Sequence, residues 1–300
     1  MGGAAGSAEM GGPAGSAEMG AVAGSADMAQ RRAVVRMARR PAVAGQFYPA
    51  DRDQLAESVD AMLAAVEIDG TPAPAAFVVP HAGYRYSGPT AAYAYARLQG
   101  RGNVDRVVLL GPAHFVPLHG CAVPAADTWL TPLGEVALDV SGAEALVAAG
   151  LATRDDEPHA PEHSLEVQLP FLQRVLDSFR LLPIAVGVSS MDSVAACVAG
   201  ALTDPDTAGR TVVICSTDLS HYLDEDTANA HDEQTVQAIG DLAPERIMST
   251  DACGSYALRG FLGWARRIGM TAHVLYRCTS ASTGGPASRV VGYAAVELLY

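Results

Sequence analysis

From about residue 41 onward, hydrophobic positions follow two alternating patterns along the chain. Short continuous apolar runs predict strands buried on both faces of a sheet. Apolar residues three and four positions apart predict helices, because such positions share one helix face. The predicted strands are Ala75–Pro80, Val107–Leu110, Val136–Val140, Leu181–Val188, Thr211–Cys215, His273–Tyr276 and Val290–Glu297.

Helical patterns lie between these strands. The first runs from Leu55 to Val66 behind Asp51, a suitable N-cap, and the second starts with Ser87 as cap and Pro89 in its first turn. The alternation of strand and helix predicts an α/β fold of three layers, a central mixed and mostly parallel sheet with helices on both faces. The remaining predicted helices are Glu166–Leu176, Ser193–Leu202, Asp226–Ile239 and Tyr256–Arg267.

Residues 1–40 have a different character. The stretch Ala5–Met10 returns at Ala14–Met19 and, with Asp for Glu, at Ala23–Met28. Such small residues bury little apolar surface, so we predict a disordered repeat tail, followed by a solvated basic linker with five arginines in residues 31–40. No linker pattern appears in residues 41–300, which we expect to form a single domain.

Composition removes several function classes. The 300 residues are 49% hydrophobic and 18% charged, as in globular proteins, and the net charge of −13 disfavours nucleic-acid binding. The sequence contains no lysine, which excludes P-loop, Schiff-base and protein-kinase chemistry. The five cysteines form no C-x-x-C pair, and no signal peptide or membrane-length apolar run is present. We therefore expect a soluble, cytoplasmic protein without membrane contact.

Three histidines follow three predicted strands. His81 comes after the run that ends at Pro80, His114 follows the second clear strand, and His221 follows Cys215. The carboxyl ends of parallel strands meet at one edge of a sheet, so these imidazoles should converge. Convergent neutral imidazoles are typical ligands of Fe(II), Zn(II) or copper.

A third, anionic ligand would complete such a site. The candidates are Asp218, Glu162 and the thiolate of Cys253, and spacing alone does not choose among them. Cys253 precedes a predicted helix, whose N-terminus is expected to lower the thiol pKa. Glu162 is expected to cap the helix that follows it.

One competing motif is a zinc-peptidase pattern. His159, Glu162 and His163 satisfy H-x-x-E-H, which requires both histidines on one helix face. Pro161 interrupts that helix, because proline lacks an N–H and disfavours helical geometry at the residue before it. The peptidase interpretation is therefore rejected. A serine hydrolase is disfavoured as well, since no G-x-S-x-G motif occurs.

Eight short strings occur in the order and approximate spacing of one family. The chain from Pro41 to Tyr300 resembles the Memo family, whose prokaryotic members are called AmmeMemoRadiSam system protein B. The strings are Ala44–Tyr48, Val79–Gly88, Leu110–His114, Thr131–Gly134, Glu162–Glu166, Thr217–His221, Ala252–Gly254 and Val291–Tyr293.

The resemblance implies a fold like the catalytic subunit of class III extradiol dioxygenases. It also implies that His81, His114 and Cys253 are the metal ligands, with the cysteine where the dioxygenases have glutamate. His221 then matches their acid/base histidine, with Asp218 beside it to orient it. A thiolate suits iron, copper or zinc, but it is open to oxidation. Fe(II) is the expected metal, with copper or zinc as alternatives.

The remaining implications concern the pocket and the role. The expected pocket residues are Phe47, Tyr84, Tyr86 and His163. One hypothesis is a non-haem metal-dependent oxidoreductase that acts on an unknown small molecule or peptide. The other is a non-catalytic metal-holding or peptide-binding module. The family name implies an AMMECR-type protein and a radical-SAM enzyme as partners.

Overall fold

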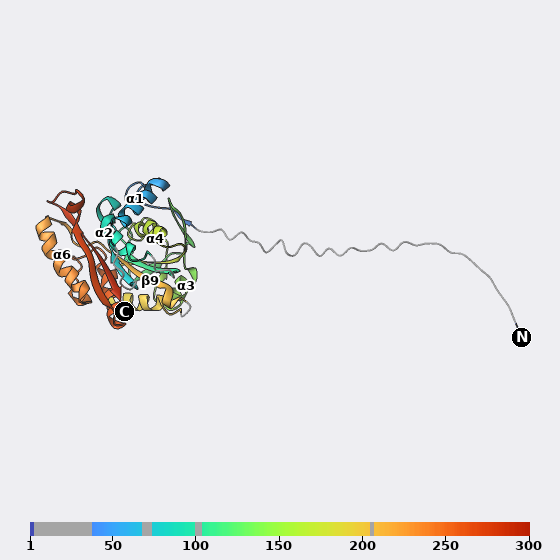
Figure 1. Ribbon diagram of the computed structural model, residues 1–300. Helices are drawn as coiled ribbons and strands as arrows, with labels where there is room; N and C mark the ends of the chain where they lie inside the picture. Colours follow the sequence, from blue (N-terminus) through green and yellow to red (C-terminus); the bar gives the residue numbers. More distant parts are fainter. Residues whose placement is uncertain (3–37, 68–73, 100–103, 205–206) are drawn as a thin grey trace. The chain divides into compact units, whose positions relative to one another are not determined.

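The computed structural model describes residues 1–2, 38–67, 74–99, 104–204 and 207–300, and the fold is drawn in Figure 1. The predicted repeat tail lies outside the described residues. The last part of the predicted basic linker is described. Arg39 is 8% exposed and pairs with Glu166, so it is buried where the sequence predicts a solvated arginine.

Most described strands belong to one sheet. These are β2 (Ala76–Val79), β3 (Arg106–Pro112), β4 (Cys121–Val123), β7 (Thr153–Arg154), β8 (Arg180–Val186), β9 (Thr211–Ser216), β10 (His221–Leu223), β11 (Thr271–Thr279) and β12 (Val290–Leu299). Within the described ranges the sheet has nine strands in the order β10-β12-β2-β9-β3-β8-β4-β7, and β11 also pairs with β12. A smaller sheet contains β1 (Ala38–Arg39), β5 (Thr128–Thr131) and β6 (Gly134–Ala137).

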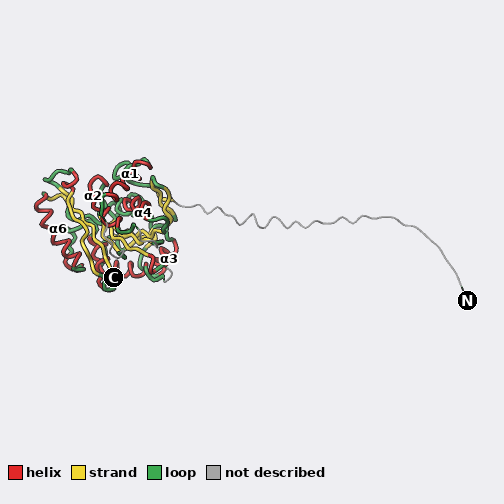
Figure 2. The backbone as a smooth tube through the Cα atoms, in the orientation of Figure 1, coloured by secondary structure: helices red, strands yellow, loops and turns green. Residues whose placement is uncertain are grey.

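The large sheet is mixed, as predicted, and its parallel part is central. Strands β2, β9, β3 and β8 run parallel to one another, whereas β12 and β4 flank them antiparallel. The carboxyl ends of β2, β9 and β3 therefore lie at the same edge, next to one another. Figure 2 shows the strands between the helices.

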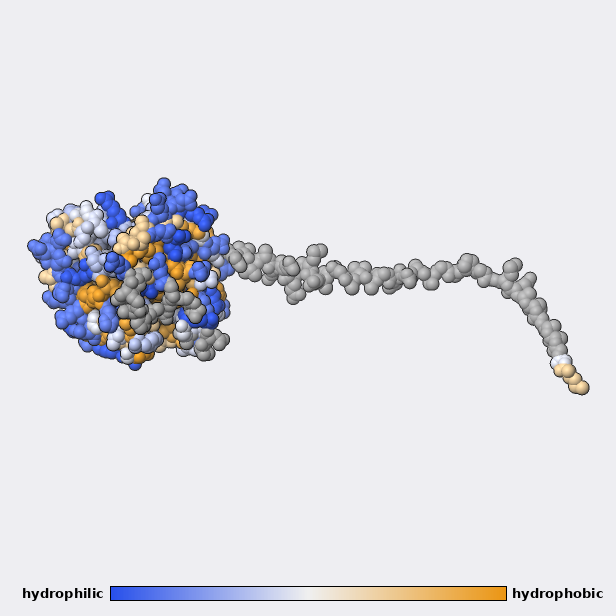
Figure 3. All heavy atoms as spheres, in the orientation of Figure 1, coloured by the Kyte–Doolittle hydropathy of each residue, from blue (hydrophilic) through white to orange (hydrophobic). Residues whose placement is uncertain are grey.

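Helices cover both faces. On one face lie α1 (Arg52–Ala64), α2 (Tyr84–Ala96) and α4 (Leu169–Val175); on the other lie α3 (Val140–Ala148), α5 (Met191–Ala201), α6 (Glu225–Gly240) and α7 (Ser255–Arg267). Short 3-10 helices are η1 (Glu166–Gln168), η2 (Ala208–Arg210), η3 (Pro244–Arg246) and η4 (Ser280–Thr283). The three-layer α/β sandwich is thus confirmed. Figure 3 shows hydrophilic side chains gathered over α1 and α6.

The central strands explain why both faces are apolar. In β3, Val108 and Leu110 pack in the core under α5 and α7, while Val107 and Leu109 pack in the core under α1 and α2. Because successive side chains of a strand point to opposite faces, a continuous apolar run fills both cores at once. No helix in the described ranges is long and apolar enough to cross a membrane.

Two predicted boundaries are wrong for local reasons. Helix α2 begins at Tyr84, not Ser87, because the Tyr84 N–H donates to the Phe47 carbonyl and starts the helix one turn earlier. Pro89 consequently lies inside the helix. The predicted strand Val136–Val140 ends at Ala137, since the Asp139 carboxylate accepts the Gly142 N–H and caps helix α3, which the sequence pattern missed.

The predicted helix Glu166–Leu176 is divided. Its first turn is the 3-10 helix η1, and the α-helix α4 begins only at Leu169. Pro170 stands at the first turn of α4, where a missing N–H costs no intrahelical bond. The division matters for the site, because η1 carries Glu166 and Gln168, both buried.

Candidate metal centre

Strand ends bring the predicted histidines together. His81 follows β2, His114 follows β3, and His221 begins β10 shortly after β9. The rings of His81 and His114 have centroids 5.2 Å apart and planes at 78°. The convergence expected from strands that run parallel in one sheet is therefore found for these two histidines, although β9 lies between β2 and β3.

Cys253 joins them from the segment before α7. Its Sγ lies 3.1 Å from Nε2 of His81. One potential ligand atom from each of His81, His114 and Cys253 lies within 4.8 Å of the other two, as a shared metal ion requires. A second such group, His114, Glu162 and His163, overlaps with the first at His114.

Hydrogen bonds determine which nitrogen of His81 is free. Its Nδ1 lies 2.9 Å from Ser216 Oγ, and that hydroxyl donates its single proton to the Ser164 carbonyl at 2.7 Å. Ser216 Oγ must therefore accept from His81, so the proton is on Nδ1 and a lone pair remains on Nε2, toward Cys253. Gln168 also donates to Ser216 Oγ and fixes it further. This tautomer is the one that a metal-binding histidine uses.

Glu162 does the same for His114. Its Oε1 lies 2.9 Å from His114 Nδ1 and its Oε2 accepts the His114 N–H at 2.6 Å. It also accepts the N–H groups of His163 and Ser164. Burial raises the pKa of this carboxyl, but the hydrogen bonds it accepts, first of all from His114, outweigh burial and lower it to about 2. Rather than capping a helix, as predicted, Glu162 orients His114 so that its Nε2 is free.

His163 packs between the ligands and the aromatic wall. Its ring stacks on that of His114, with centroids 4.7 Å apart and planes at 18°. The centroid of the Phe47 ring also lies 4.7 Å from that of His163, with planes at 54°. Burial lowers the pKa of His163 to about 4, and burial with the nearby histidines lowers that of His81 well below its usual value. These imidazoles are therefore neutral at pH 7, which metal ligation requires.

The thiol of Cys253 differs from the expectation. Burial raises its pKa to about 12, and the charge of Asp218 adds to the rise. Three contacts lower the pKa without offsetting burial: the Asp218 N–H at 3.3 Å from the sulfur, Thr217 Oγ1 at 3.7 Å, and the N–H of Gly254 at the start of α7. A bound cation would supply the charge that lets this thiol lose its proton. Two imidazole lone pairs and one sulfur thus fit a transition metal.

Asp218 and His221 are placed differently from each other. Asp218 is buried and accepts the His81 N–H at 2.6 Å, and burial raises its pKa to about 6. His221 is half-buried, and its Nδ1 lies 2.8 Å from the Leu219 carbonyl. The hydrogen bond that orients His221 therefore comes from the main chain of its own turn, and Asp218 instead holds the segment that carries His81.

A cavity of about 690 Å³ contains these groups. Its lining includes Phe47, Tyr86 and His163, three of the four predicted pocket residues. Tyr84 is the exception, because its hydroxyl donates to the Val167 carbonyl at 2.6 Å and its ring packs on Phe171 in the core. The full lining is Gln46, Phe47, His81, Ala82, Gly83, Tyr86, His114, His163, Asp218, His221, Tyr222, Cys253, Ser280, Gly285, Pro286, Arg289, Val291 and Tyr293.

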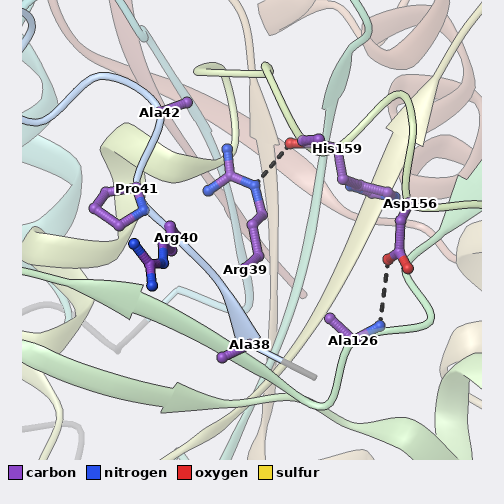
Figure 4. A pocket seen from close by; sticks show the side chains of 9 residues that line it. Ala38, Arg39, Arg40, Pro41, Ala42, Ala126, Asp156 and His159 are labelled. Atoms are coloured by element: carbon purple, nitrogen blue, oxygen red, sulfur yellow. Dashed lines mark hydrogen bonds between the residues drawn. The ribbon is translucent and has the colours of Figure 1, made fainter. Parts of the chain in front are cut away.

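Arg39 is a supporting residue that the sequence analysis missed. Its guanidinium donates to the carbonyls of His159 and Glu162 and to the carboxylate of Glu166, each at 2.7 Å. Figure 4 shows Arg39 reaching His159 beside a separate cavity. The loop that carries Glu162 is therefore fixed from behind. Sequence spacing gave no signal for this, because 127 residues separate Arg39 from Glu166.

A donor set of two histidines and one cysteine, at the carboxyl edge of a three-layer α/β sandwich, defines a class of candidate metal-binding proteins. Within that class the chain belongs to the Memo family, since the family model described as Memo-like protein matches residues 39–297.

Curated relatives agree with that assignment. A MEMO1 family protein of Methanopyrus kandleri is 36% identical over 274 residues, which cover 85% of this chain and 96% of the relative. Another, from Ignicoccus hospitalis, is 36% identical over 276 residues, with the same coverage of 85% and 96%. A third, from Methanococcoides burtonii, is 38% identical over 267 residues, covering 85% of this chain and 97% of the relative.

Proposed function

We propose that this Memo-family protein binds one transition-metal ion through His81, His114 and Cys253 and acts as a metal-dependent redox protein. The observation that carries the proposal is the mutual approach of the three donor atoms within 4.8 Å. Two of the donors are nitrogens whose lone pairs are freed by hydrogen bonds at the opposite side of each ring.

Fe(II) is the metal we favour, with copper or zinc as alternatives. Neutral imidazoles accept all three ions, and a thiolate suits them better than it suits magnesium or calcium. When bound, iron or copper would supply one-electron redox chemistry to a ligand in the cavity.

The chain's own groups would bind and orient that ligand and move a proton. His221 lines the cavity, and its Nδ1 is held by the Leu219 carbonyl, which leaves Nε2 as the nitrogen that exchanges a proton. The aromatic rings of Phe47 and Tyr86 form an apolar wall that excludes water from part of the cavity. Asp218 keeps His81 in place through the His81 N–H.

A second candidate is a non-catalytic metal-holding or peptide-binding module. The observation that favours it is the sulfur of Cys253 in the donor set, because a thiolate beside a redox metal is readily oxidised. Under either candidate we propose a cytoplasmic protein that works with an AMMECR-type protein and a radical-SAM enzyme, on an unknown small molecule or peptide.

Elemental analysis of protein purified without oxygen tests the metal site. We expect about one transition-metal ion per chain, as for one three-ligand site. His114→Ala should lose the ion, whereas His119→Ala, which removes an exposed histidine outside the donor set, should keep it. Full occupancy in His114→Ala would show that the ligand set is wrong.

The enzyme and the module differ in the effect of His221→Ala. For an enzyme, this variant keeps its metal and loses turnover of any compound that the iron-loaded wild type converts in an aerobic screen. Wild-type protein with full metal occupancy and no turnover of any compound tested would favour the module.

A further inference from the structure

The cavity that holds the candidate metal ligands is also lined by Arg289. This arginine is exposed, and its guanidinium carbon lies 4.3 Å from the centre of the Tyr222 ring. Among the ion pairs found in residues 38–67, 74–99, 104–204 and 207–300, none includes Arg289. Asp218 lines the same cavity but forms no ion pair with Arg289 among the described residues, so in a chain of net charge −13 this arginine is available for an anion from solution.

Tyr222 is held beside Arg289 by an unusual backbone. In the pairing of β10 with β12, His221 faces Val291 and Leu223 faces Val290, so Tyr222 is the extra residue of a β-bulge. Its φ is +64°, a left-handed conformation that tyrosine rarely adopts. Neighbouring strand residues normally point to opposite faces, yet His221 and Tyr222 both line the cavity. The bulge is what directs both side chains to one place.

Backbone strain of this kind persists where surrounding contacts enforce it, and it concentrates at ligand sites. Tyr222 in this bulge is 62% exposed, although an aromatic ring is normally stabilised by burial. The arrangement makes sense if the ring and the guanidinium together meet a ligand.

We propose that Arg289 and Tyr222 form the carboxylate-binding end of the cavity, and that the ligand is a small carboxylic acid with a planar apolar body. The guanidinium fork matches the two oxygens of a carboxylate. The aromatic rings of Tyr222, Phe47 and Tyr86 line the same cavity and give a planar body apolar surface to pack on. A cavity of about 690 Å³ has the size of a small-molecule site.

The charge of the lining selects a monoanion. Arg289 is the single arginine and Asp218 the single carboxyl group among the described lining residues, so a phosphate dianion would find one arginine and would also face an acid. The inference rests on the proposed function only in that the acid shares its cavity with the metal.

Calorimetric titration with benzoate tests the inference, with benzamide as the uncharged molecule of the same shape. We expect benzoate to bind metal-free and metal-loaded protein, and benzamide to bind at least ten-fold more weakly. Arg289→Gln should weaken benzoate binding ten-fold or more, which is the effect of losing one charge-assisted pair. Arg266→Gln, which changes a surface arginine on α7, should leave benzoate binding unchanged.

Several results would overturn it. The first is that wild type binds no benzoate at roughly 10 mM, the weakest affinity of interest. The second is equal binding of benzoate and benzamide, and the third is unchanged benzoate binding by Arg289→Gln. The fourth is tighter binding of phenyl phosphate than of benzoate. Metal content separates the two proposals. Arg289→Gln should hold as much metal as wild type, and Arg289-dependent benzoate binding by a chain that takes up no metal would refute the metal site alone.

Discussion

The two ends of the cavity are built in different ways. At the inner end, which we define as His81, His114 and Cys253, the two histidines directly follow the regular central strands β2 and β3. At the outer end, defined as His221, Tyr222 and Arg289, the side chains come from a bulged three-residue strand and the segment before β12. The inner histidines are each oriented by a buried side chain, Ser216 or Glu162, whereas the ring of His221 at the outer end is oriented by a main-chain carbonyl, that of Leu219.

This difference matches two kinds of ligand. A metal ion needs donor atoms in nearly fixed positions, and rigid strand ends with buried hydrogen-bond partners supply them. An organic molecule tolerates more variation, and a bulge near the edge of a sheet can change its residues without disturbing the central strands. The same cavity therefore combines a constrained end and an adaptable end.

The largest effect is expected from the carboxylate behind the inner end. Glu162→Ala removes the acceptor of four hydrogen bonds, two of them from His114. Leaving those donors without a partner should lower the free energy of unfolding by about 3–5 kcal/mol. Metal affinity should fall by about 10–100-fold, because His114 loses its orienting partner. Urea unfolding and metal titration measure the two effects.

Glu157→Ala is the matched control, since Glu157 is an exposed glutamate in the same loop. It should leave both quantities within error of wild type. If Glu162→Ala behaved like Glu157→Ala, the inner end would not depend on its hydrogen bonds, and the contrast between the two ends would fail.

A smaller effect is expected when the pH is lowered, because His159, which lies behind the same loop, makes the free energy of unfolding depend on pH. This ring is 1% exposed; its Nε2 lies 3.1 Å from the Ala122 carbonyl, and its Nδ1 has no partner among the described residues. Burial lowers its pKa from 6.5 to about 4, with Arg39 adding to the fall and Asp155 and Asp156 opposing it. The unfolded chain therefore binds the proton first as pH falls.

The stability that His159 contributes is thus fully present above pH 6.5 and is lost as pH falls toward about 4. The total is about 3 kcal/mol. Urea unfolding at several pH values should show this slope in wild type and a flatter one in His159→Gln. His119→Gln, at an exposed histidine, should keep the wild-type slope. If His159→Gln kept the wild-type dependence of unfolding on pH, another group would be the cause of the acid sensitivity.

The smallest effect is expected at the outer end. Tyr222→Asn places a residue that tolerates left-handed geometry at φ +64°, so the free energy of unfolding should rise by about 1 kcal/mol. Benzoate binding should weaken several-fold because the ring beside Arg289 is gone. Tyr276→Asn, on β11, is the control and should not stabilise. A loss of stability in Tyr222→Asn would mean that the bulge is not strained.

Sequence patterns were sufficient to predict the three layers of the fold, because its central strands are continuous apolar runs. The same logic brought His81 and His114 to one edge. The third ligand was not determined by pattern: Asp218, Glu162 and Cys253 were all open, and Cys253 was chosen through the family resemblance. The structure brings its sulfur to 3.1 Å from His81.

What the sequence could not supply were contacts between distant or irregular segments. Helix α3 was missed because the cap at Asp139 interrupts an apolar run that looks like a strand. Tyr84 was assigned to the pocket, although the earlier start of α2 turns its ring into the core. The acidity of Cys253 was predicted in the wrong direction, because burial outweighs the helix N-terminus.

The position of β12 has a consequence for how the protein is made. β12, which follows the other described strands in the sequence, lies between β10 and β2, and its residue Gly292 exchanges hydrogen bonds with Leu219 and Ser220 beside His221. A ribosome releases β12 after it has synthesised the described strands β1 to β11. The nascent polypeptide therefore carries His81, His114 and Cys253 before β12 can join the sheet, and a chain that stops short of Val290 lacks the part of the cavity lining that β12 supplies.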